Sequence, residues 1–331
     1  MRALVQNGYG GAEVLAVADV PEPSPGRGEV AIAVSAAGVH AGDVWIMRGE
    51  PLLIRAAFGL KRPRRPVVGR DVAGVVSAVG EGVTTLAVGD RVYAECDQGG
   101  FAETAVVAAA YARRAPANLD DVHAAVIPVS ATTALQALRL GRVGPGDRVL
   151  VIGASGGVGT YAVQLATALG AQVTGVASAA KADHVRAAGA IRVIDHRTDD
   201  PTRGGHIYDV IIDLVAAQSL TALIGILAPR GTLVLSAGTG SRVLGPLPRM
   251  AAATLRSPFT RRRLKPLAAR HSGDDLEELR ALAEDGRLRP VVDEVVPFDR
   301  APDAVARLAS GEVRGKVAIR VGAAQPSSTA P

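Results

Sequence analysis

Seven consecutive residues near the middle of the chain have the composition of a phosphate-binding turn. The segment GASGGVG at 153–159 follows a short apolar run at 148–152 and leads into a helical pattern at 158–169 that ends at Gly170. Glycines let the backbone approach a pyrophosphate, and the free amides at a helix N-terminus stabilise its charge. A glycine-rich turn made only for packing is the alternative, but strand, glycines, helix and second strand follow in the order that a nucleotide site needs. We therefore expect four of these residues to bind a dinucleotide: Ser155, Gly156, Gly157 and Val158.

The residues after the second strand indicate which dinucleotide binds. An acid about 20 residues beyond the glycines would accept hydrogen bonds from the ribose hydroxyls of NAD. The sequence instead reads Ala177-Ser178-Ala179-Ala180-Lys181, with a hydroxyl, a cation and no carboxylate to repel a 2′-phosphate. This predicts NADPH. The alternative is that Lys181 is only a solvated charge at a helix start.

The elements around this turn predict an α/β fold with two domains. Up to about residue 115, short β segments alternate with Gly and Pro, which is typical of a small barrel; they lie at 2–6, 29–36, 67–79, 91–94 and 101–107. From about Asp121, helix and strand patterns alternate as in a doubly wound parallel sheet, with strands at 148–152, 173–177, 193–195, 210–213 and 232–236.

The end of the chain returns to β character after a helix at about 274–284. Strands at 291–296 and 316–321 have no parallel-sheet helix after them, so we expect them to rejoin the first domain. The predicted domains are 1–120 with 288–331, and 121–287. The segment 322–331 is polar and rich in Pro and Ser, and is interpreted as a frayed tail.

Composition narrows the function classes. Of 331 residues, 48% are hydrophobic, and Cys96 is the only cysteine, so neither an internal disulfide nor a cysteine-rich zinc cluster can form. The net charge of +5 affects solubility and steering, and we expect no nucleic-acid partner. The start of the chain has no signal-peptide pattern, and no apolar run reaches the roughly 18 residues of a spanning helix, which predicts a cytoplasmic protein.

Several motifs in order resemble one family over nearly the whole chain. They are GGAEVL at 10–15, PGRGEV at 25–30, AAGV at 36–39 followed by Asp43, GRDVAGVV at 69–76, VGDRV at 88–92, GFAE at 100–103, Thr133-Ala134 and RGKV at 314–317. Together they resemble the medium-chain dehydrogenase/reductases, in particular the zinc-lacking, quinone-oxidoreductase-like members. The resemblance implies a GroES-like β-barrel catalytic domain, built from both chain ends, and a Rossmann domain, with cofactor and substrate in the cleft between them.

The resemblance also implies residue roles. Ser178, Lys181 and His196 match positions around the 2′-phosphate in NADPH-using relatives, although the last is commonly Tyr. Four further residues match positions that line the nicotinamide half of the cleft: Thr133, Ser236, Gly238 and Lys316. A helix-capping hydroxyl and a strand-edge cation are the alternative interpretations of Thr133 and Lys316.

The pattern of a catalytic zinc site is incomplete. Zinc-dependent relatives need three protein ligands and one open position. His40 stands where they have their first ligand, a Cys, and Arg70 replaces the second, a His; an arginine cannot ligate and its charge repels a metal. No metal site is therefore predicted.

Without a Lewis acid, hydride transfer to an already activated acceptor, a quinone or an α,β-unsaturated carbonyl, is the favoured chemistry. By resemblance, a loop at 40–49 faces the nicotinamide. His40 could supply there a hydrogen-bond donor or a titrating acid, or it could be an ordinary hydrogen-bonded loop histidine. We expect Asp43 to fix this loop rather than to exchange protons, and Trp45 and Arg48 could line the pocket.

A basic segment between Gly240 and Gly273 leaves alternatives open. It has no acid and eight cations: Arg242, Arg249, Arg256, Arg261, Arg262, Arg263, Lys265 and Arg270. By resemblance, relatives place here a helix and an edge strand that pairs subunits, which implies an edge strand at 263–268 and a homodimer. The alternatives are a basic amphipathic face on an anionic membrane and a solvated helix face. Two other functions also stay open. One is an enone or polyketide-intermediate reductase, and the other is a non-catalytic NADPH-responsive protein that could bind RNA through this basic segment.

Overall fold

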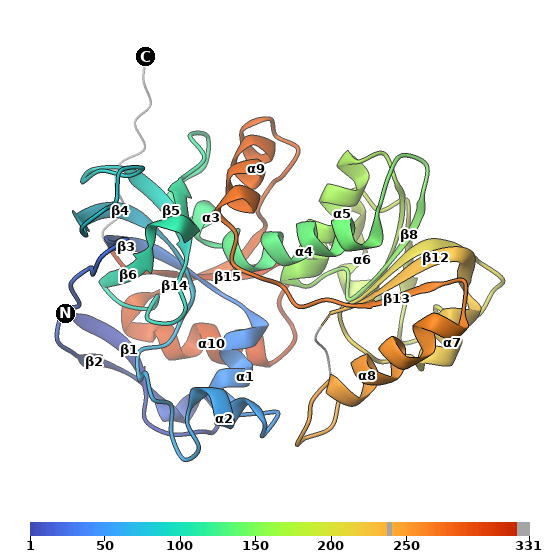
Figure 1. Ribbon diagram of the computed structural model, residues 1–331, viewed down its shortest axis with the longest axis horizontal. Coiled ribbons are helices and arrows are strands. Elements are labelled where there is room, and N and C mark those ends of the chain that lie inside the picture. Colours follow the sequence, from blue (N-terminus) through green and yellow to red (C-terminus); the bar gives the residue numbers. More distant parts are fainter. Residues whose placement is uncertain (237–239, 323–331) are drawn as a thin grey trace.

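The computed structural model describes residues 1–236 and 240–322. The described chain forms two lobes side by side (Figure 1), one built from both ends of the chain and the other from its middle. No helix of the described residues is long and apolar enough to cross a membrane.

The lobe made from both chain ends is mostly antiparallel sheet. Its seven-stranded sheet has the order β14-β15-β3-β4-β5-β7, with β6 also pairing with β3, and β1 and β2 form a separate antiparallel pair. The strands are β1 (Arg2–Gln6), β2 (Leu15–Asp19), β3 (Glu29–Val39), β4 (Asp71–Val79), β5 (Arg91–Glu95), β6 (Thr104–Ala108), β7 (Ala112–Arg114), β14 (Val292–Pro297) and β15 (Lys316–Arg320). Its helices are α1 (Ala41–Arg48), α2 (Ile54–Phe58), α3 (Asp121–Ala125) and α10 (Ala301–Ala309), with short 3₁₀ turns at Ala12–Val14, Ala109–Tyr111 and Phe298–Arg300. β15 pairs with β3, so the last strand of the chain lies in the same sheet as strands from its beginning.

The other lobe is a six-stranded parallel sheet in the order β10-β9-β8-β11-β12-β13. The strands are β8 (Arg148–Ile152), β9 (Gln172–Ala177), β10 (Arg192–Asp195), β11 (Tyr208–Asp213), β12 (Leu227–Leu235) and β13 (Arg263–Pro266). The helices are α4 (Pro128–Gly141), α5 (Gly157–Ala168), α6 (Ala182–Ala187), α7 (Leu220–Gly225), α8 (Leu247–Arg256) and α9 (Gly273–Glu284), with 3₁₀ turns at Ala179–Lys181 and Ser257–Phe259. The strand order reverses between β8 and β11: β9 and β10 follow on one side of β8, and β11 to β13 lie on the other. Ligands bind at such switch points in doubly wound sheets.

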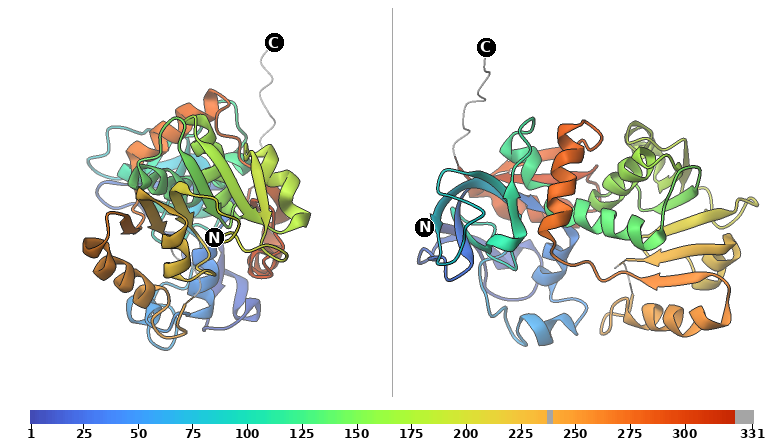
Figure 2. Two further views of the ribbon diagram at one scale, coloured as in Figure 1. Left: turned by 90° about the vertical axis from the view of Figure 1, so that its right-hand side faces the viewer. Right: turned by 45° about the horizontal axis from the view of Figure 1, so that its top comes forward.

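Alternating side chains of the central strands bury both faces of this sheet, because successive residues of a strand point to opposite sides. Val149 and Val151 belong to the core that packs against α4 and α5, whereas Leu150 and Ile152 belong to the core that packs against α7 and α8. Helices accordingly cover both sides of the sheet (Figure 2), and α9 lies between the lobes, in contact with α4 and β7.

Two expectations about local structure were wrong. The segment at 40–49, expected as a loop, is mostly the helix α1. The strands β14 and β15, expected without a parallel-sheet helix, pair in parallel and are joined by α10. Parallel neighbours need a crossover, and α10 supplies it by burying Ala301, Ala304 and Val305 against the lobe core.

Candidate functional site

The glycine turn connects β8 to α5 as the sequence predicts. Gly153 has a φ of 88°, a conformation that L-residues with a side chain rarely adopt. A Cβ at Gly159 would lie 2.1 Å from the Gly153 carbonyl oxygen, so only glycine lets α5 start this close to the turn. Gly156 is the N-cap of α5, so no N-cap side chain accepts hydrogen bonds from the first amides of this helix. These N-terminal amides are the groups that a pyrophosphate would use.

A cavity of about 550 Å³ lies beside this turn. It contains four of the residues predicted to bind the cofactor, Ser155, Ser178, Lys181 and His196, which come from the turn, the end of β9, the following 3₁₀ turn and the residue after β10. The segment 310–314 of the other lobe also lines the cavity, so both lobes contribute to it. The sequence argument missed two cations in its lining, Arg197 and Arg314.

Basic side chains outnumber acidic ones in the described lining of this cavity. Among its lining residues that the structure describes, Lys181, Arg197 and Arg314 face a single acid, Glu312. Lys181 is partly exposed, and its Nζ donates to the carbonyls of Gly311 at 2.8 Å and Val313 at 2.9 Å. Burial is the main cause that lowers the pKa of this ammonium group. The environment is therefore suited to a multiply charged anion.

A backbone hydrogen bond also joins the lobes at the turn. The Gly315 amide donates to the Ser155 carbonyl at 3.0 Å. A Cβ at Gly157 would meet Lys316 Cδ at 2.7 Å, so the first turn of α5 packs directly on the start of β15.

His40 and Asp43 hold each other at the start of α1. The Gly42 amide donates to His40 Nδ1 at 3.0 Å, and the His40 amide donates to Asp43 Oδ2 at 2.9 Å, which together cap the helix. Because Nδ1 accepts a hydrogen bond, the ring proton lies on Nε2, 3.4 Å from Asp43 Oδ1. Both side chains are buried.

Burial has opposite effects on these two groups. It lowers the pKa of His40 well below its ordinary value, helped by Lys316 and Arg70, so the imidazole is neutral at neutral pH. Burial, opposed by the hydrogen bond from the His40 amide, raises the pKa of Asp43 to about 7. Of the roles proposed for His40, the titrating acid is disfavoured, and the hydrogen bonds agree with Asp43 as a residue that fixes this segment.

A buried ion pair lies where α4 meets the other lobe. Lys316 Nζ donates to Ser130 Oγ at 2.9 Å and lies 3.5 Å from Asp71 Oδ2. Asp71 Oδ1 accepts from the Val129 amide at 2.9 Å, so the carboxylate takes the place of a side-chain cap at the N-terminus of α4. Burial raises the pKa of Asp71 and lowers that of Lys316, against the attraction between them. Lys316 is thus not a cation exposed at a strand edge.

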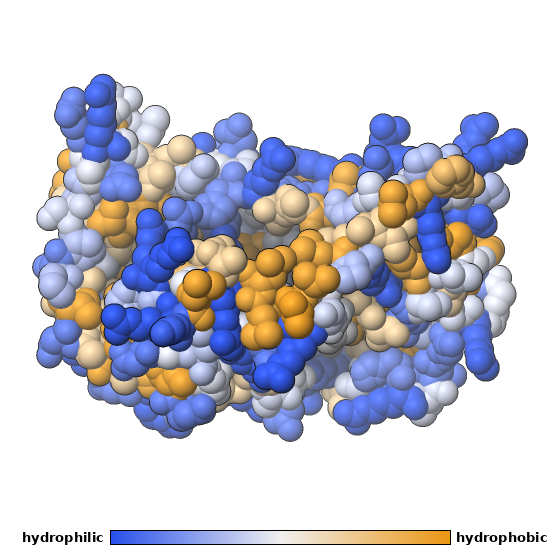
Figure 3. Space-filling model, turned by 60° about the horizontal axis from the view of Figure 1, so that its bottom comes forward, coloured by the Kyte–Doolittle hydropathy of each residue, from blue (hydrophilic) through white to orange (hydrophobic). Residues whose placement is uncertain are grey.

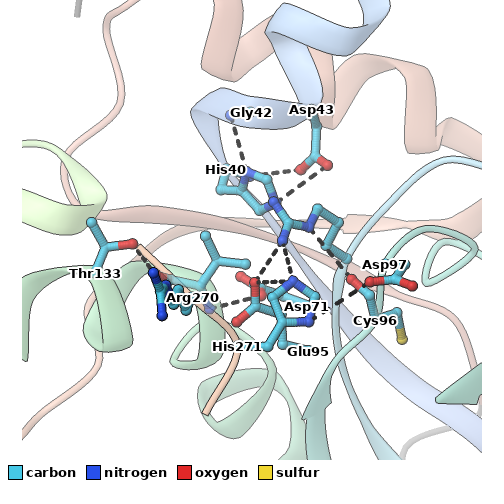
Figure 4. A network of polar contacts seen from close by, with 12 residues as sticks. His40, Gly42, Asp43, Asp71, Glu95, Cys96, Asp97, Thr133, Arg270 and His271 are labelled. Carbon is cyan, nitrogen blue, oxygen red and sulfur yellow. Dashed lines mark hydrogen bonds and ion pairs between the residues drawn. The ribbon is translucent and has the colours of Figure 1, made fainter. Parts of the chain in front are cut away.

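Arg70, which the resemblance matched to a zinc-ligand position, is held in a second polar group. Its Nη2 lies 2.7 Å from Glu95 Oε1 and 2.6 Å from His271 Nε2. Burial is the main cause that raises the pKa of Glu95 to about 7 and lowers that of His271. In Figure 4, His40, Asp43, Asp71, Glu95 and His271 lie in one polar network. In the described part of the chain, no three or more His, Cys, Asp or Glu residues group so as to hold a metal ion.

The remaining predicted residues lie around the same junction. Thr133 is inside α4, where its hydroxyl donates to the Val129 carbonyl at 2.7 Å, rather than at a helix cap. Ser236 follows β12 and its amide donates to the Asp213 carbonyl at 3.1 Å. Gly238 lies outside the described residues. The contacts of Thr133, Ser236 and Lys316 with a nicotinamide stay predictions.

Comparisons with known proteins agree with this arrangement. Residues 26–117 match the family described as alcohol dehydrogenase GroES-like domain, and residues 188–319 match the family described as zinc-binding dehydrogenase. The chain is 32% identical over 333 residues to the chloroplast envelope quinone oxidoreductase homolog of Arabidopsis thaliana, a match that covers 96% of this chain and 98% of that protein. The chain belongs to the medium-chain dehydrogenase/reductase superfamily, in its quinone-oxidoreductase-like branch.

Two further relatives support this placement in the medium-chain dehydrogenase/reductases. The structure of the quinone oxidoreductase from Coxiella burnetii matches with a TM-score of 0.87 and 25% identity, covering 97% of this chain and 99% of that one. The pikromycin polyketide synthase component PikAII of Streptomyces venezuelae is 36% identical over 319 residues, which are 94% of this chain and 8% of that protein. The expected fold, a GroES-like domain with a Rossmann-type parallel sheet, is confirmed.

Oxidoreductases of this superfamily use nicotinamide cofactors, and the residues of this chain fit such a group. The turn offers uncapped helix amides, and the nearest heavy atom to a Cβ on Gly156 would be 3.6 Å away, which leaves room for a phosphate beside it. The adjoining cavity takes cations from both lobes. Ser155, Gly156, Gly157 and Val158 would hold the pyrophosphate, and the cavity would hold the adenosine end.

The functional residues that sequence reasoning missed fall into two groups. Arg197 and Arg314 flank residues already singled out, His196 and the RGKV motif, so their neighbourhood was the available signal. Asp71 and Glu95 are acids at the ends of largely apolar strands, a pattern that indicates buried charge with a partner. For His271, no signal in the sequence points to Arg70.

Proposed function

We propose that this chain is an NADPH-dependent oxidoreductase that transfers hydride to a quinone or an α,β-unsaturated carbonyl without a metal ion. The observation that carries the cofactor part is the cation-rich cavity at the end of β9, where Ser178 follows the strand and no carboxylate takes the position that would bind NAD hydroxyls. Lys181, Arg197 and Arg314 offer charge to a 2′-phosphate that NADH does not have.

The double variant Arg197→Gln, Arg314→Gln tests this assignment. Neither guanidinium has an ion-pair partner among the residues that the structure describes, so their loss leaves no buried charge. We expect KM for NADPH to rise roughly 10- to 100-fold, the weight of one or two charge-assisted contacts, while KM for NADH stays unchanged. Arg203→Gln, an exposed arginine of the same lobe, is the matched control. An equal or better kcat/KM with NADH in the native protein would refute the assignment.

The proposal of metal independence rests on the residues at the ligand positions. Arg70 brings a positive charge that is already committed to Glu95 and His271, and His40 Nδ1 is committed to the Gly42 amide. A zinc ion there would have to displace both sets of contacts. We expect dialysis against a chelator to leave turnover unchanged. Stoichiometric zinc in protein purified without added metal would overturn this proposal.

Bound nicotinamide would supply the hydride, and the chain's own groups would position the acceptor and exclude water. An activated carbonyl that receives hydride leaves negative charge on an oxygen, which hydrogen-bond donors stabilise. We propose that His40 serves there as a neutral donor through Nε2–H, oriented by the Gly42 amide and by Asp43. Asp43 would keep α1 in place through its bond to the His40 amide. The proton that completes the reduction would come from water, since the imidazole is not charged at neutral pH.

A second candidate function is supported by the polyketide synthase relative, which is 36% identical over 94% of the chain. In this alternative, the acceptor is an enone or polyketide intermediate, reduced by the same hydride chemistry at a more selective site. Turnover with small quinones and with short enoyl thioesters separates the two: a strong preference for the thioester would favour the second function. No NADPH oxidation with either would leave the non-catalytic binder.

We also propose a homodimer that forms through β13. This strand pairs with β12 on one side and has its other edge free of strands in the described chain. Phe259, 92% exposed, and Leu255 lie just before it. Phe259→Glu should convert dimers to monomers in light scattering after size exclusion; a monomeric native protein would contradict the proposal. We also propose that the protein is cytoplasmic, which cell fractionation would check.

A further inference from the structure

Two segments of the chain carry positive charge without any acid. The first is the basic segment, 240–273, with eight Arg and Lys residues. The second, at 51–70, belongs to the other lobe and has six: Arg55, Lys61, Arg62, Arg64, Arg65 and Arg70. None of these cations is among the described residues that line the cofactor cavity.

The structure joins these segments across the two lobes. The Leu52 amide donates to the Arg242 carbonyl at 2.9 Å, and the Leu53 amide donates to the Val243 carbonyl at 3.0 Å. Pro51 packs so closely on Gly245 that a Cβ there would lie 2.6 Å from Pro51 Cγ. The loop before α2 and the loop before α8 therefore form one surface.

Apolar side chains of this surface are open to solvent. Between 43% and 73% of each side chain is exposed in a set that we call the junction patch: Leu53, Leu60, Val243, Leu244 and Leu247. Figure 3 looks onto this side of the molecule and shows apolar residues gathered near its centre with hydrophilic residues around them. Contiguous exposed apolar groups with a polar rim mark a surface that another phase or molecule covers.

The rim of the junction patch keeps a net positive charge. Acids oppose four of the arginines of the two segments: Glu50 lies 3.0 Å from Arg242, Asp213 lies 2.7 Å from Arg249, Asp97 lies 4.0 Å from Arg65, and Glu95 lies 2.7 Å from Arg70. Three exposed cations on the loop after α2 have no ion-pair partner among the described residues: Lys61, Arg62 and Arg64.

We propose that the junction patch docks the protein reversibly on an anionic lipid bilayer. Leucine and valine side chains enter the boundary between headgroups and acyl chains, while the surrounding Lys and Arg contact lipid phosphates. This goes beyond the proposed function, because docking does not depend on which acceptor is reduced.

Other occupants fit less well. A second copy of the chain on the same patch would bring like charges together. A nucleic acid would use the cations but would leave the aliphatic side chains in water. The aromatic rings of the two segments are Phe58, Phe259 and His271, and His271 is already in contact with Arg70.

Cosedimentation with vesicles tests the proposal. The probes are vesicles of phosphatidylcholine with phosphatidylglycerol, and vesicles of phosphatidylcholine alone. We expect binding to the anionic vesicles that weakens at high salt. The triple variant Lys61→Gln, Arg62→Gln, Arg64→Gln should lower the partition coefficient roughly 100-fold, about five-fold for each cation near an anionic surface.

A second pair of variants separates the apolar contribution from charge. Leu60→Ser with Val243→Ser, which leave the net charge unchanged, should strongly lower sedimentation. Val88→Ser with Ile191→Ser, similarly exposed aliphatic residues elsewhere, should lower it far less. Circular dichroism checks that each variant is folded. Absence of binding to anionic vesicles, or equal loss in both pairs, overturns the proposal. So does retention by duplex DNA or RNA without vesicle binding, or a change of oligomeric state in the patch variants alone.

Discussion

Removing the buried ammonium group of Lys316 should destabilise the protein strongly. Its Nζ lies 3.5 Å from Asp71 Oδ2 with both side chains buried, so their attraction at an effective dielectric constant of about 20 is about 5 kcal/mol. Lys316→Met leaves Asp71 buried with only the Val129 amide as a direct hydrogen-bond donor. Breaking one side of such a pair costs about 3–5 kcal/mol, and we expect a loss of unfolding free energy in that range at pH 7.

The double variant Asp71→Asn, Lys316→Met should recover most of this loss. Asparagine still accepts from the Val129 amide through Oδ1, and no unpaired charge stays buried. The coupling energy of the cycle should therefore reach about 2 kcal/mol or more. Lys61→Met, at an exposed lysine, is the control and should change stability by about 0.5 kcal/mol or less.

Urea unfolding can be followed by circular dichroism and by the fluorescence of Trp45, the only tryptophan, which lies in α1. Agreement of the two probes checks that both lobes unfold together. If Lys316→Met costs less than about 1 kcal/mol, or if the two single variants are additive, the pair does not stabilise the junction and this reasoning fails.

Three further outcomes are expected. Gly159→Ala should prevent NADPH binding, measured by quenching of Trp45 or by calorimetry, because the added Cβ would lie 2.1 Å from the Gly153 carbonyl; normal affinity would contradict the close approach. The pKa of Asp43 is about 7 in the folded protein and 3.8 in the unfolded chain, so ionisation of this carboxyl group favours unfolding as pH rises from 4 to 8. Over that interval the unfolding free energy of Asp43→Asn should increase by about 4 kcal/mol relative to that of the native protein. A difference in urea unfolding that stays constant with pH would refute this reasoning. His40→Asn, which can still cap α1, should leave the pH profile of kcat unchanged, because a neutral imidazole does not titrate there; loss of one limb would restore the titrating acid.

The Rossmann-type lobe could be predicted in some detail because its signals are local. The apolar run of β8, the glycines at 153–159 and the helix after them follow one another directly, and the prediction of β8 matches to the residue. Helix α1 was missed because His40 is an unusual N-cap and two glycines bracket a short pattern. Helix α10 is amphipathic, with Ala301, Ala304 and Val305 buried and Asp303 exposed, so its periodicity was an available signal that the prediction did not use.

The polar network could not be predicted, because its contacts join distant parts of the chain. Lys316 and Ser130 are 186 positions apart, and Arg70 and His271 are 201 apart. A single sequence holds no information on such pairs beyond the presence of charged residues in apolar strands. Arg314 is likewise far in sequence from Ser178 and His196, so the RGKV motif alone did not predict that it lines the cofactor cavity.

Because both lobes line the cofactor cavity, the affinity for a ligand bound there is coupled to the association of the two lobes. Segment 310–314 belongs to the antiparallel lobe, yet it closes the cavity whose other wall carries Ser178 and His196. A dinucleotide held there would act as a strut between the lobes, and its binding free energy would add to the stability of their docking. Resistance to proteolysis at the lobe junction should therefore rise with cofactor concentration. A specificity change engineered in the parallel-sheet lobe alone would leave the contribution of Glu312 and Arg314 unaltered.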